Sequence, residues 1–396
     1  MEQLIKDGEL ILGDGYRTKR AEHGRPGIPI LRVAEVLNGR IEPAFADYVS
    51  EHFRSVMGTK TSQPGDIVLT TKGTVGRVAL VTAQHPEFVY SPQVCFFRLN
   101  SESVIVRRYL YYWFRSTEFW RQAVNHKGKT DMADYINLAD IRSLELSLPN
   151  IAVQQGISEV LGALDDKIAV NARVAATSMR LAASIFEDSE PTVEFTLGDI
   201  AEVFDGPHAT PKKTEDGPWF LSISSLKSGL LDLDESAHLG EEDYPRWTKR
   251  VQPRAGDVLF SYETRLGDAA LMLPTIRACL GRRMGLIRSR RTEISGPLLL
   301  QAYLGNNFQS EISKRAIHGA TVDRIPIKEL PRWPIKLPAS RRWERLSTML
   351  KSLSDCATHR TLENRSLAQL RDTLLPKLMS GRLRIRDAGR MVEDAT

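Results

Sequence analysis

Short apolar runs separated by glycine, proline and polar residues characterise the first hundred residues of the chain. Three of them, Ile67–Thr70, Val78–Thr82 and Val94–Leu99, have the length and the boundaries of buried strands. Residues 109–124 then place aromatic rings at helical spacing, which predicts one helix whose rings pack into a core rather than stack on bases. The pattern therefore predicts a globular domain with a β-rich core.

The chain repeats this pattern about 190 residues further along. Gly65-Asp66 and the apolar run after it return as Gly256-Asp257 with a similar run, a displacement of 256 − 65 = 191, and Gly76 returns as Gly267. Asp14-Gly15 and Asp205-Gly206 each precede a basic loop and a short apolar strand. Only the second copy shows a lead-in of the Leu197–Ala201 type. A long internal repeat predicts two copies of one domain.

Each copy ends in a pattern typical of a long helix. Apolar residues alternate at spacings of three and four, as along the contact line, or seam, of a coiled coil. A first helix from about Ala152 to Asp188 would be roughly 55 Å long at 1.5 Å per residue, between one and two turns of B-DNA. Pro191 and Pro376 are expected to end the helices. The seam residues are Ile157, Leu161, Leu164, Ile168, Asn171, Ala175, Leu181 and Ile185, and then Leu346, Leu350, Leu353, Ala357 and Arg360, with Leu367, Leu370 and Leu374 continuing less regularly.

Two such helices in one chain predict an antiparallel coiled coil. The expected fold is of the α+β class, with two β-rich globular domains related by pseudo-twofold symmetry and each followed by a long helix. Asn171 lies on the first seam, and Arg360 stands at the position displaced by 189. A polar seam residue can fix the register and orientation of a helix pair. Alternatively, both side chains lie at solvated edges, and the sequence alone does not separate the two.

Composition and charge narrow the setting. The 396 residues are 42% hydrophobic and 26% charged, which is typical of a globular protein and excludes a disordered chain. No apolar run reaches the roughly 18 residues of a membrane helix, and no signal peptide is seen, so we expect a cytoplasmic protein without a membrane partner. Cys95, Cys279 and Cys356 are too scattered for a disulfide framework or a metal cluster. A formal charge of +5 permits a polyanionic partner.

Motifs that would indicate catalysis are missing from the sequence. Gly128-Lys129-Thr130 imitates the end of a nucleotide-binding P-loop, but that loop needs a glycine where Ala123 stands and should follow a strand. The chain also has no Asp/Asn-Pro-Pro-aromatic run, no Gly-x-Gly-x-x-Gly and no His-Glu-x-x-His. We therefore expect no catalytic residue, no metal and no cofactor.

Several segments, taken in order, resemble the specificity subunits of type I restriction-modification systems. They are Gly13–Lys19 with Pro29–Val33, Gly65–Val68 with Lys72–Val78, and Leu148-Pro149 ahead of the helix with Gln154-Gln155, Ile157, Leu161, Leu164-Asp165 and Lys167-Ile168. The resemblance covers nearly the whole chain, in two copies. No single motif is diagnostic, so the order, the spacing and the repetition carry it.

The resemblance implies a non-catalytic DNA-binding subunit of a methyltransferase and endonuclease complex. Two target-recognition domains, 1–150 and 191–338, would each read one half of a bipartite, asymmetric double-stranded DNA target. A central spacer helix, 151–190, and a C-terminal spacer helix with a basic tail, 339–396, would set the gap and dock two modification (methyltransferase) subunits, through which restriction (translocase and nuclease) subunits join. Because the glycine-rich Thr71–Gly76 becomes Tyr262–Gly267, we expect two different half-sites.

Candidate DNA contacts lie on turns and basic loops. Lys72, Thr74 and Arg77 occupy a turn whose glycines would let the backbone approach a phosphate, and Arg265 lies on the equivalent turn, although such a turn can equally be a plain tight hairpin. Arginine and lysine serve both base reading and phosphate binding, and the sequence does not sort these roles. Further candidates are Tyr16, Arg17, Lys19, Arg20, Lys127, Lys129 and Thr130 in the first copy, and His208, Lys212, Lys213, His318, Thr321 and Arg324 in the second.

Two other classes of protein stay open. A DNA-modifying enzyme with unrecognised motifs would bind S-adenosylmethionine or cut DNA by itself. A coiled-coil scaffold would use the duplicated domains to hold proteins rather than DNA. Steeply salt-dependent binding to one bipartite duplex would exclude the scaffold.

Overall fold

The computed structural model describes residues 1–42, 44–126, 135–190, 192–319 and 322–396, and it divides into two compact units. Unit 1 comprises Met1–Lys167 and Leu367–Thr396, and unit 2 comprises Ile168–Ser366. Both boundaries fall inside the long helices, so each unit combines one globular domain with part of each helix. The division into recognition domains and spacer helices that the sequence predicts stays a prediction.

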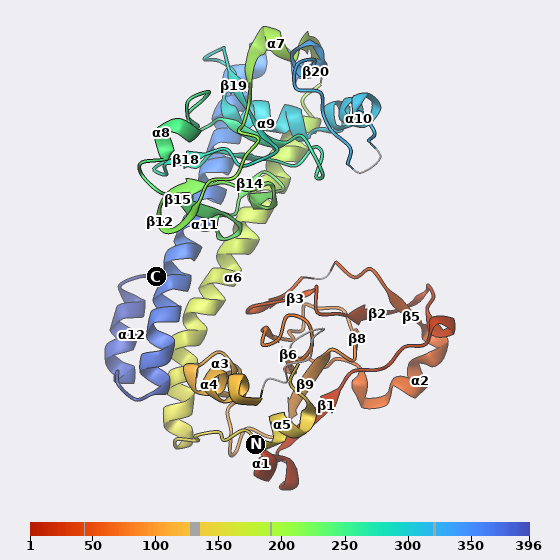
Figure 1. Cartoon of the computed structure of the whole chain (residues 1–396), viewed down its shortest axis with the longest axis vertical. Coiled ribbons are helices and arrows are strands. Elements are labelled where there is room, and N and C mark those ends of the chain that lie inside the picture. Colours follow the sequence, from red (N-terminus) through yellow and green to blue (C-terminus); the bar gives the residue numbers. More distant parts are fainter. Residues whose placement is uncertain (43, 127–134, 191, 320–321) are drawn as a thin grey trace. The chain divides into compact units, whose positions relative to one another are not determined.

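Unit 1 is built on a four-stranded antiparallel sheet in the order β1-β9-β6-β7 (Figure 1). A three-stranded sheet, β5-β2-β8, and a short hairpin, β3-β4, complete its strands. All four residues of β6 are buried, which explains its unbroken apolar run. The strands are β1 (Leu10–Asp14), β2 (Gly27–Leu31), β3 (Val36–Leu37), β4 (Arg40–Ile41), β5 (Tyr48–Ser50), β6 (Ile67–Thr70), β7 (Val78–Leu80), β8 (Val89–Tyr90) and β9 (Val94–Leu99).

Unit 2 repeats this topology strand for strand. Its main sheet has the order β11-β19-β16-β17, its second sheet β15-β12-β18, and its hairpin is β13-β14. In both units the central strand of the second sheet has one antiparallel and one parallel neighbour. The strands are β11 (Ala201–Asp205), β12 (Lys213–Phe220), β13 (Leu226–Lys227), β14 (Leu230–Leu231), β15 (Ala237–Leu239), β16 (Val258–Ser261), β17 (Ala269–Leu271), β18 (Ala278–Cys279) and β19 (Met284–Ser289), with an added pair, β10 (Thr192–Thr196) and β20 (Pro334–Pro338). The predicted α+β fold and its duplication are confirmed.

The aromatic segment after the main sheet forms two helices where one was predicted. α3 (Arg107–Phe114) and α4 (Thr117–His126) are separated because the Ser116 hydroxyl accepts a hydrogen bond from the backbone N–H of Phe119 (3.3 Å) and so starts a new helix. The rings of Tyr112, Trp113 and Phe119 are buried in the core, as predicted, whereas Trp120, expected there too, is 37% exposed. The equivalent pair in unit 2 is α9 (Gly296–Leu304) and α10 (Asn306–Arg315).

Short helices precede or connect the strands. α1 (Glu2–Lys6) comes before β1 as α7 (Leu197–Ile200) comes before β11, so the lead-in predicted only for the second copy has a helical counterpart in the first. The others are α2 (Arg54–Met57), α5 (Leu138–Ser143) and α8 (Tyr244–Trp247).

The two long helices are α6 (Ile151–Glu187) and α11 (Trp343–Met379). The prediction that Pro376 ends the second helix is wrong, because α11 continues through it to Met379. The proline carbonyl accepts hydrogen bonds from the backbone N–H (3.2 Å) and the hydroxyl (2.7 Å) of Ser380, which satisfy the helix end one turn later. Pro191 lies outside the described residues.

Part of the predicted basic tail is a further helix, α12 (Ile385–Glu393), which packs beside α6 and α11 in unit 1 (Figure 1). Gly156 makes this contact possible, since a Cβ there would lie 2.9 Å from the Cδ1 of Ile385. Ala388 and Val392 are buried in the same helix. One face of α12 is therefore packed within unit 1.

Within each unit, α6 and α11 pack against each other in antiparallel orientation. In unit 1 the Arg371 guanidinium donates to the Asp165 carboxylate (2.8 Å), and in unit 2 the Asn364 amide donates to the carbonyl of Ile168 (3.0 Å). Ala182 and Leu350 lie in one core cluster of unit 2. The predicted antiparallel coiled coil is thereby confirmed.

The seam differs from the prediction in detail. Leu181 is 49% exposed, and Met179 and Ala182 are buried instead, because an α-helix of 3.6 residues per turn drifts away from a strict heptad line. Asn171 is buried, whereas Arg360 is half-buried and pairs with Glu363 on its own helix (2.8 Å). A register role for Asn171 stays a prediction. Of the other predicted seam residues, Ile157, Leu161, Leu164, Leu346, Leu350 and Ala357 are buried, and Ile168 and Leu353 are partly buried.

A buried aspartate–arginine pair explains the repeated Gly-Asp motif. The Asp66 carboxylate, 1% exposed, accepts two hydrogen bonds of 2.7 Å from the Arg98 guanidinium of β9. Asp257 receives the same pair from Arg288 of β19, at 2.8 and 2.6 Å. Each carboxylate also accepts from a backbone N–H three residues earlier, so the aspartate closes the turn that leads into the central strand. Among the described residues, no helix is long and apolar enough to cross a membrane.

Replacing Asp66 tests this anchor. Asp66→Ala leaves the Arg98 guanidinium, which is only 11% exposed, without its carboxylate, and should lower the free energy of unfolding by about 3–5 kcal/mol in chemical denaturation. Asp47→Ala is the control, because its pair with Arg32 is about 40% exposed on both sides and should cost no more than about 1 kcal/mol. Equal losses for the two variants would contradict the anchor.

The revised seam makes a second prediction. Leu350→Ala removes a fully buried side chain and should lower the free energy of unfolding by about 2–5 kcal/mol. Leu181→Ala, at the same kind of residue on the partner helix, should change it by less than about 0.5 kcal/mol because Leu181 is half-exposed. A large loss of unfolding free energy in Leu181→Ala would instead favour the strict heptad seam predicted from the sequence.

Candidate nucleic-acid interface

The turn between β6 and β7 carries the first group of predicted DNA contacts. Lys72 and Thr74 are exposed, and among the described residues the Lys72 ammonium has no hydrogen-bond or ion-pair partner. Arg77 is half-buried and its guanidinium donates to the carbonyl of Val36 (3.3 Å), so part of its bonding capacity is used inside unit 1. Gly76 adopts a φ of 89° beneath the Trp120 ring, where a Cβ would lie 2.0 Å from the ring. The Trp120 ring therefore supports the backbone of the turn on one side, and the exposed side chains of Lys72 and Thr74 can contact a ligand.

The equivalent turn of unit 2, between β16 and β17, has a different charge. Glu263 stands where unit 1 has Lys72, and Asp268 stands where it has Arg77, each displaced by 191. The predicted contact Arg265 pairs with Asp268 (2.6 Å), and Arg283 pairs with Glu263 (2.9 Å). A turn with paired charges presents hydrogen-bonding groups rather than net positive charge to a polyanion.

The two turns have the same backbone contacts and the same backbone conformation. Lys72 forms an isolated β-bridge with Tyr135, and Glu263 forms one with Arg324, so the same loop passes beside each turn. Thr264 takes a φ of 68° at the place where Gly73 has 78°, a left-handed conformation that threonine rarely adopts. The backbone of the turn is thus retained while its side chains change.

A second shared feature is a cation that clamps the Asp-Gly turn after the first strand. Lys60 contacts the Asp14 carboxylate (2.8 Å) and the carbonyl of Gly15 (2.9 Å). Arg250 contacts Asp205 (3.3 Å) and the carbonyl of Gly206 (3.1 Å) in the same manner. Neither cation was predicted from the sequence, although their separation of 250 − 60 = 190 is the period of the repeat.

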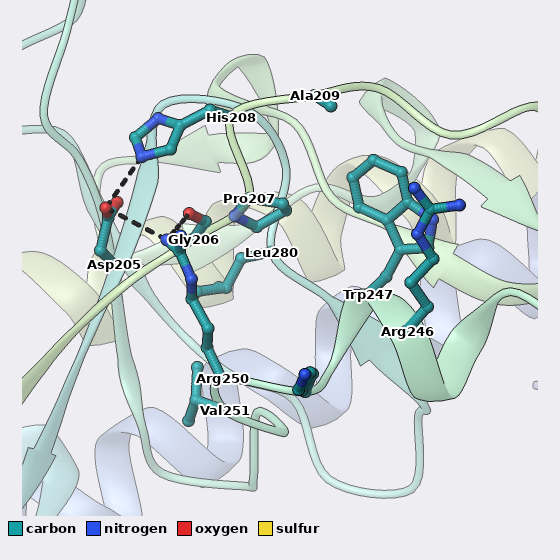
Figure 2. Close-up of a pocket in the computed structure, with 11 residues that line it drawn as sticks. Asp205, Gly206, Pro207, His208, Ala209, Arg246, Trp247, Arg250, Val251 and Leu280 are labelled. Atoms are coloured by element: carbon teal, nitrogen blue, oxygen red, sulfur yellow. Dashed lines mark hydrogen bonds and ion pairs between the residues drawn. The ribbon is translucent and has the colours of Figure 1, made fainter.

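Unit 2 has a pocket of about 430 Å³ beside this clamp (Figure 2). His208 lies at its rim, with its imidazole 3.0 Å from the Asp205 carboxylate and 3.4 Å from the Tyr262 hydroxyl. Burial and the nearby Asp205 carboxylate raise the pKa of Tyr262, so its hydroxyl stays protonated at neutral pH. The predicted residue His208 is thereby connected to the turn that carries Arg265. The pocket is lined by Asp205, Gly206, Pro207, His208, Ala209, Arg246, Trp247, Lys249, Arg250, Val251 and Leu280.

The remaining predicted contacts fall into three groups. Arg17, Lys19 and Arg20 are exposed on the basic loop of unit 1, as Lys212 and Lys213 are in unit 2. Two others are engaged within their own unit, since the Tyr16 hydroxyl donates to Glu22 (3.0 Å) and His318 contacts Asp323 (3.1 Å). Lys127, Lys129, Thr130 and Thr321 lie outside the described residues.

Comparisons with known proteins found similar proteins of one kind. Residues 12–176 match the family model for the type I restriction modification DNA specificity domain. The type I restriction enzyme MjaIX specificity subunit of Methanocaldococcus jannaschii is 20% identical over 97% of this chain and 93% of that protein. A crystal structure of the S subunit of a type I restriction-modification system from M. genitalium is similar at a TM-score of 0.53, with 16% identity and 94% of each chain covered.

The duplicated domain and the helix pair recur in the fold of these similar proteins. Residues 12–176 thus match a type I restriction modification DNA specificity domain, and the chain as a whole is similar to specificity subunits of type I restriction-modification systems, as its sequence motifs indicated. Within the part of the chain that the structure describes, no group of three or more histidine, cysteine, aspartate or glutamate residues is arranged to hold a metal ion.

Proposed function

We propose that the chain is the sequence-recognition subunit of a type I restriction-modification complex and binds a bipartite, asymmetric double-stranded DNA target. Each unit reads one half-site, and the chain itself performs no chemistry on DNA. The observation that carries the proposal is the repetition of one strand topology with different side chains on the exposed turns. A shared backbone with unlike turn residues suits two readers of unlike sequence.

The different charges on the two turns support different kinds of DNA contact in unit 1 and unit 2. In unit 1, Lys72 is available for a guanine edge or a phosphate, with Thr74 beside it. In unit 2, Arg265 is already oriented by Asp268, which leaves its remaining N–H groups for a base edge. The exposed loops with Arg17, Lys19 and Arg20, and with Lys212 and Lys213, are suited to phosphate contacts that position each unit.

The helix pair is the part of the chain that we assign to the rest of the complex. Two adenine-methyltransferase subunits would dock along α6 and α11, and the restriction translocase would join through them, in the cytoplasm. The match of residues 12–176 to the specificity-domain family and the confirmed coiled coil support this arrangement. No cofactor is required of this chain, because S-adenosylmethionine would bind the modification subunits.

Co-expression tests the function directly. The chain is produced together with its proposed modification subunit, in a host that lacks adenine methylation, and methylated adenines are mapped across the genome. The expected result is methylation at one sequence of two specific parts separated by a fixed gap. Methylation without sequence preference, or with a single uninterrupted site, would contradict the proposal.

Lys72 provides a residue-level prediction. Lys72→Ala should weaken binding of the cognate duplex by roughly five- to a hundredfold, because a side chain that reads a base edge contributes about 1–3 kcal/mol. The penalty for base changes in the first half-site should shrink, whereas base changes in the second should keep theirs. The measurement is a set of equilibrium titrations with singly altered duplexes.

Lys6→Ala serves as the matched control, since Lys6 is an exposed lysine of unit 1 that pairs with Glu2 on its own helix. It should leave all affinities unchanged. If Lys72→Ala instead lowers the affinity for every sequence by the same factor, Lys72 only contacts a phosphate.

A further inference from the structure

Comparing corresponding residues of the two units separates residues that serve the fold from residues that could bind a ligand. A residue present in both copies with the same contacts serves the fold, and a residue present in one copy only is available for a ligand. Lys60 and Arg250 belong to the first kind, because each clamps its own Asp-Gly turn. The other cations around the pocket of unit 2 belong to the second kind.

The residue of unit 1 that corresponds to Trp247 can be identified from the small apolar cluster on which Trp247 packs. Trp247 packs on Phe220, Leu239 and Cys279, and their counterparts Ile30, Val49 and Val89 pack around Met57. All four residues are displaced by 190, for example 247 − 57. On this alignment, unit 1 has Val56, Met57 and Thr59 where unit 2 has Arg246, Trp247 and Lys249.

The exchange changes the chemistry of the surface. Met57 is 1% exposed and fills the core of unit 1, whereas Trp247 is only partly buried and its indole lines the pocket. Figure 2 shows Arg246 and Trp247 at one side of the pocket, and His208 and Asp205 at the other. Arg250 lies between the two pairs and donates a hydrogen bond to the carbonyl of Gly206. Arg246, Lys249 and Arg250 are all exposed, and Asp205 is the carboxylate that offsets Arg250.

We propose that the pocket of unit 2 is a binding site for a single nucleotide, with the base against Trp247 and the phosphate held by Arg246 and Lys249. An aromatic ring beside cations is the arrangement with which proteins bind individual nucleotides, because every base has a face that can stack and every phosphate is anionic. A volume of about 430 Å³ lies within the range of small-molecule sites. His208 and Asp205 offer a donor and an acceptor for the base or the sugar.

The nucleotide that binds this pocket could come from either of two sources. One is a nucleotide of the bound DNA whose base has left the helical stack, which costs a few kcal/mol and is offset by the new contacts. The other is a free nucleotide that binds beside the turn with Arg265. The DNA source deepens the proposed function and rests on it, whereas the free-nucleotide source does not.

A graft of unit 1 residues into unit 2 tests the proposal. The triple variant Arg246→Val, Trp247→Met and Lys249→Thr carries side chains that the fold already accommodates at these positions in unit 1. The control Lys328→Val and Lys336→Thr removes two exposed cations of unit 2 outside the pocket. Circular dichroism verifies that both variants are folded. Calorimetric titration of the full chain with deoxynucleoside 5′-monophosphates, and with inorganic phosphate, then measures binding.

The expected result is that monophosphates bind the unaltered chain and the control, and that the graft weakens them by at least about tenfold. If DNA is the source, the graft also weakens duplex binding and lowers the slope of log affinity against log salt by about 1, because one phosphate is no longer neutralised. If a free nucleotide is the source, duplex affinity is unchanged.

Three outcomes overturn the nucleotide site. They are inorganic phosphate binding as tightly as the monophosphates, monophosphate binding that the graft leaves unchanged, and a loss confined to duplex DNA with no monophosphate binding at all. A failure of the proposed function is distinguishable, because the unaltered chain would then show no preference among duplexes, while the monophosphate titration would still decide the pocket.

Discussion

The buried ion pair between the Gly-Asp turn and the neighbouring strand is the constraint on which each unit depends. In unit 1, Asp66 bonds Arg98 of β9 and also accepts a hydrogen bond from Tyr90 of β8 (2.6 Å), so one carboxylate joins the main sheet to the second sheet. Burial raises the pKa of Tyr90 beside that carboxylate, which keeps the phenol protonated as a donor. Because β6 begins at this anchor and ends at the turn with Lys72, the pair fixes the base of the candidate DNA-binding turn.

The duplication separates what the fold requires from what recognition requires. Asp66 and Asp257 keep their arginines, Gly76 and Gly267 keep their left-handed φ, and Lys60 and Arg250 keep their clamps. Lys72 and Arg77, by contrast, become Glu263 and Asp268. The constant positions hold the backbone of the turn, and the side chains at the variable positions differ in charge between the units, as the proposed pair of readers would need.

Much of this was predictable from the sequence, because apolar runs and the repeat determine the strands and the duplicated topology. The strand predicted over Ile67–Thr70 and the helix predicted from Ala152 match the structure to within a residue. Leu181 and Pro376 were mispredicted, since a heptad pattern and a proline rule do not include tertiary packing. The pocket around Trp247 was missed for another reason: Arg246 and Lys249 are ordinary surface residues until folding brings them beside the Asp205 turn.

The long helices carry a charged cluster in unit 1 that unit 2 does not repeat. In unit 1 the Tyr112 hydroxyl donates to Asp165 (2.7 Å), whose other oxygen accepts from Arg371. The positions displaced by 189 to 191 in unit 2 are Tyr303, Ser354 and Ala182, all buried, and the Tyr303 and Ser354 hydroxyls have no partner among the described residues. Arg371 is only 13% exposed and pairs with both Asp165 and Asp372, so its guanidinium depends on carboxylates within unit 1. The same topology therefore accommodates a charged contact at the helix pair in unit 1 and uncharged residues at the corresponding positions of unit 2.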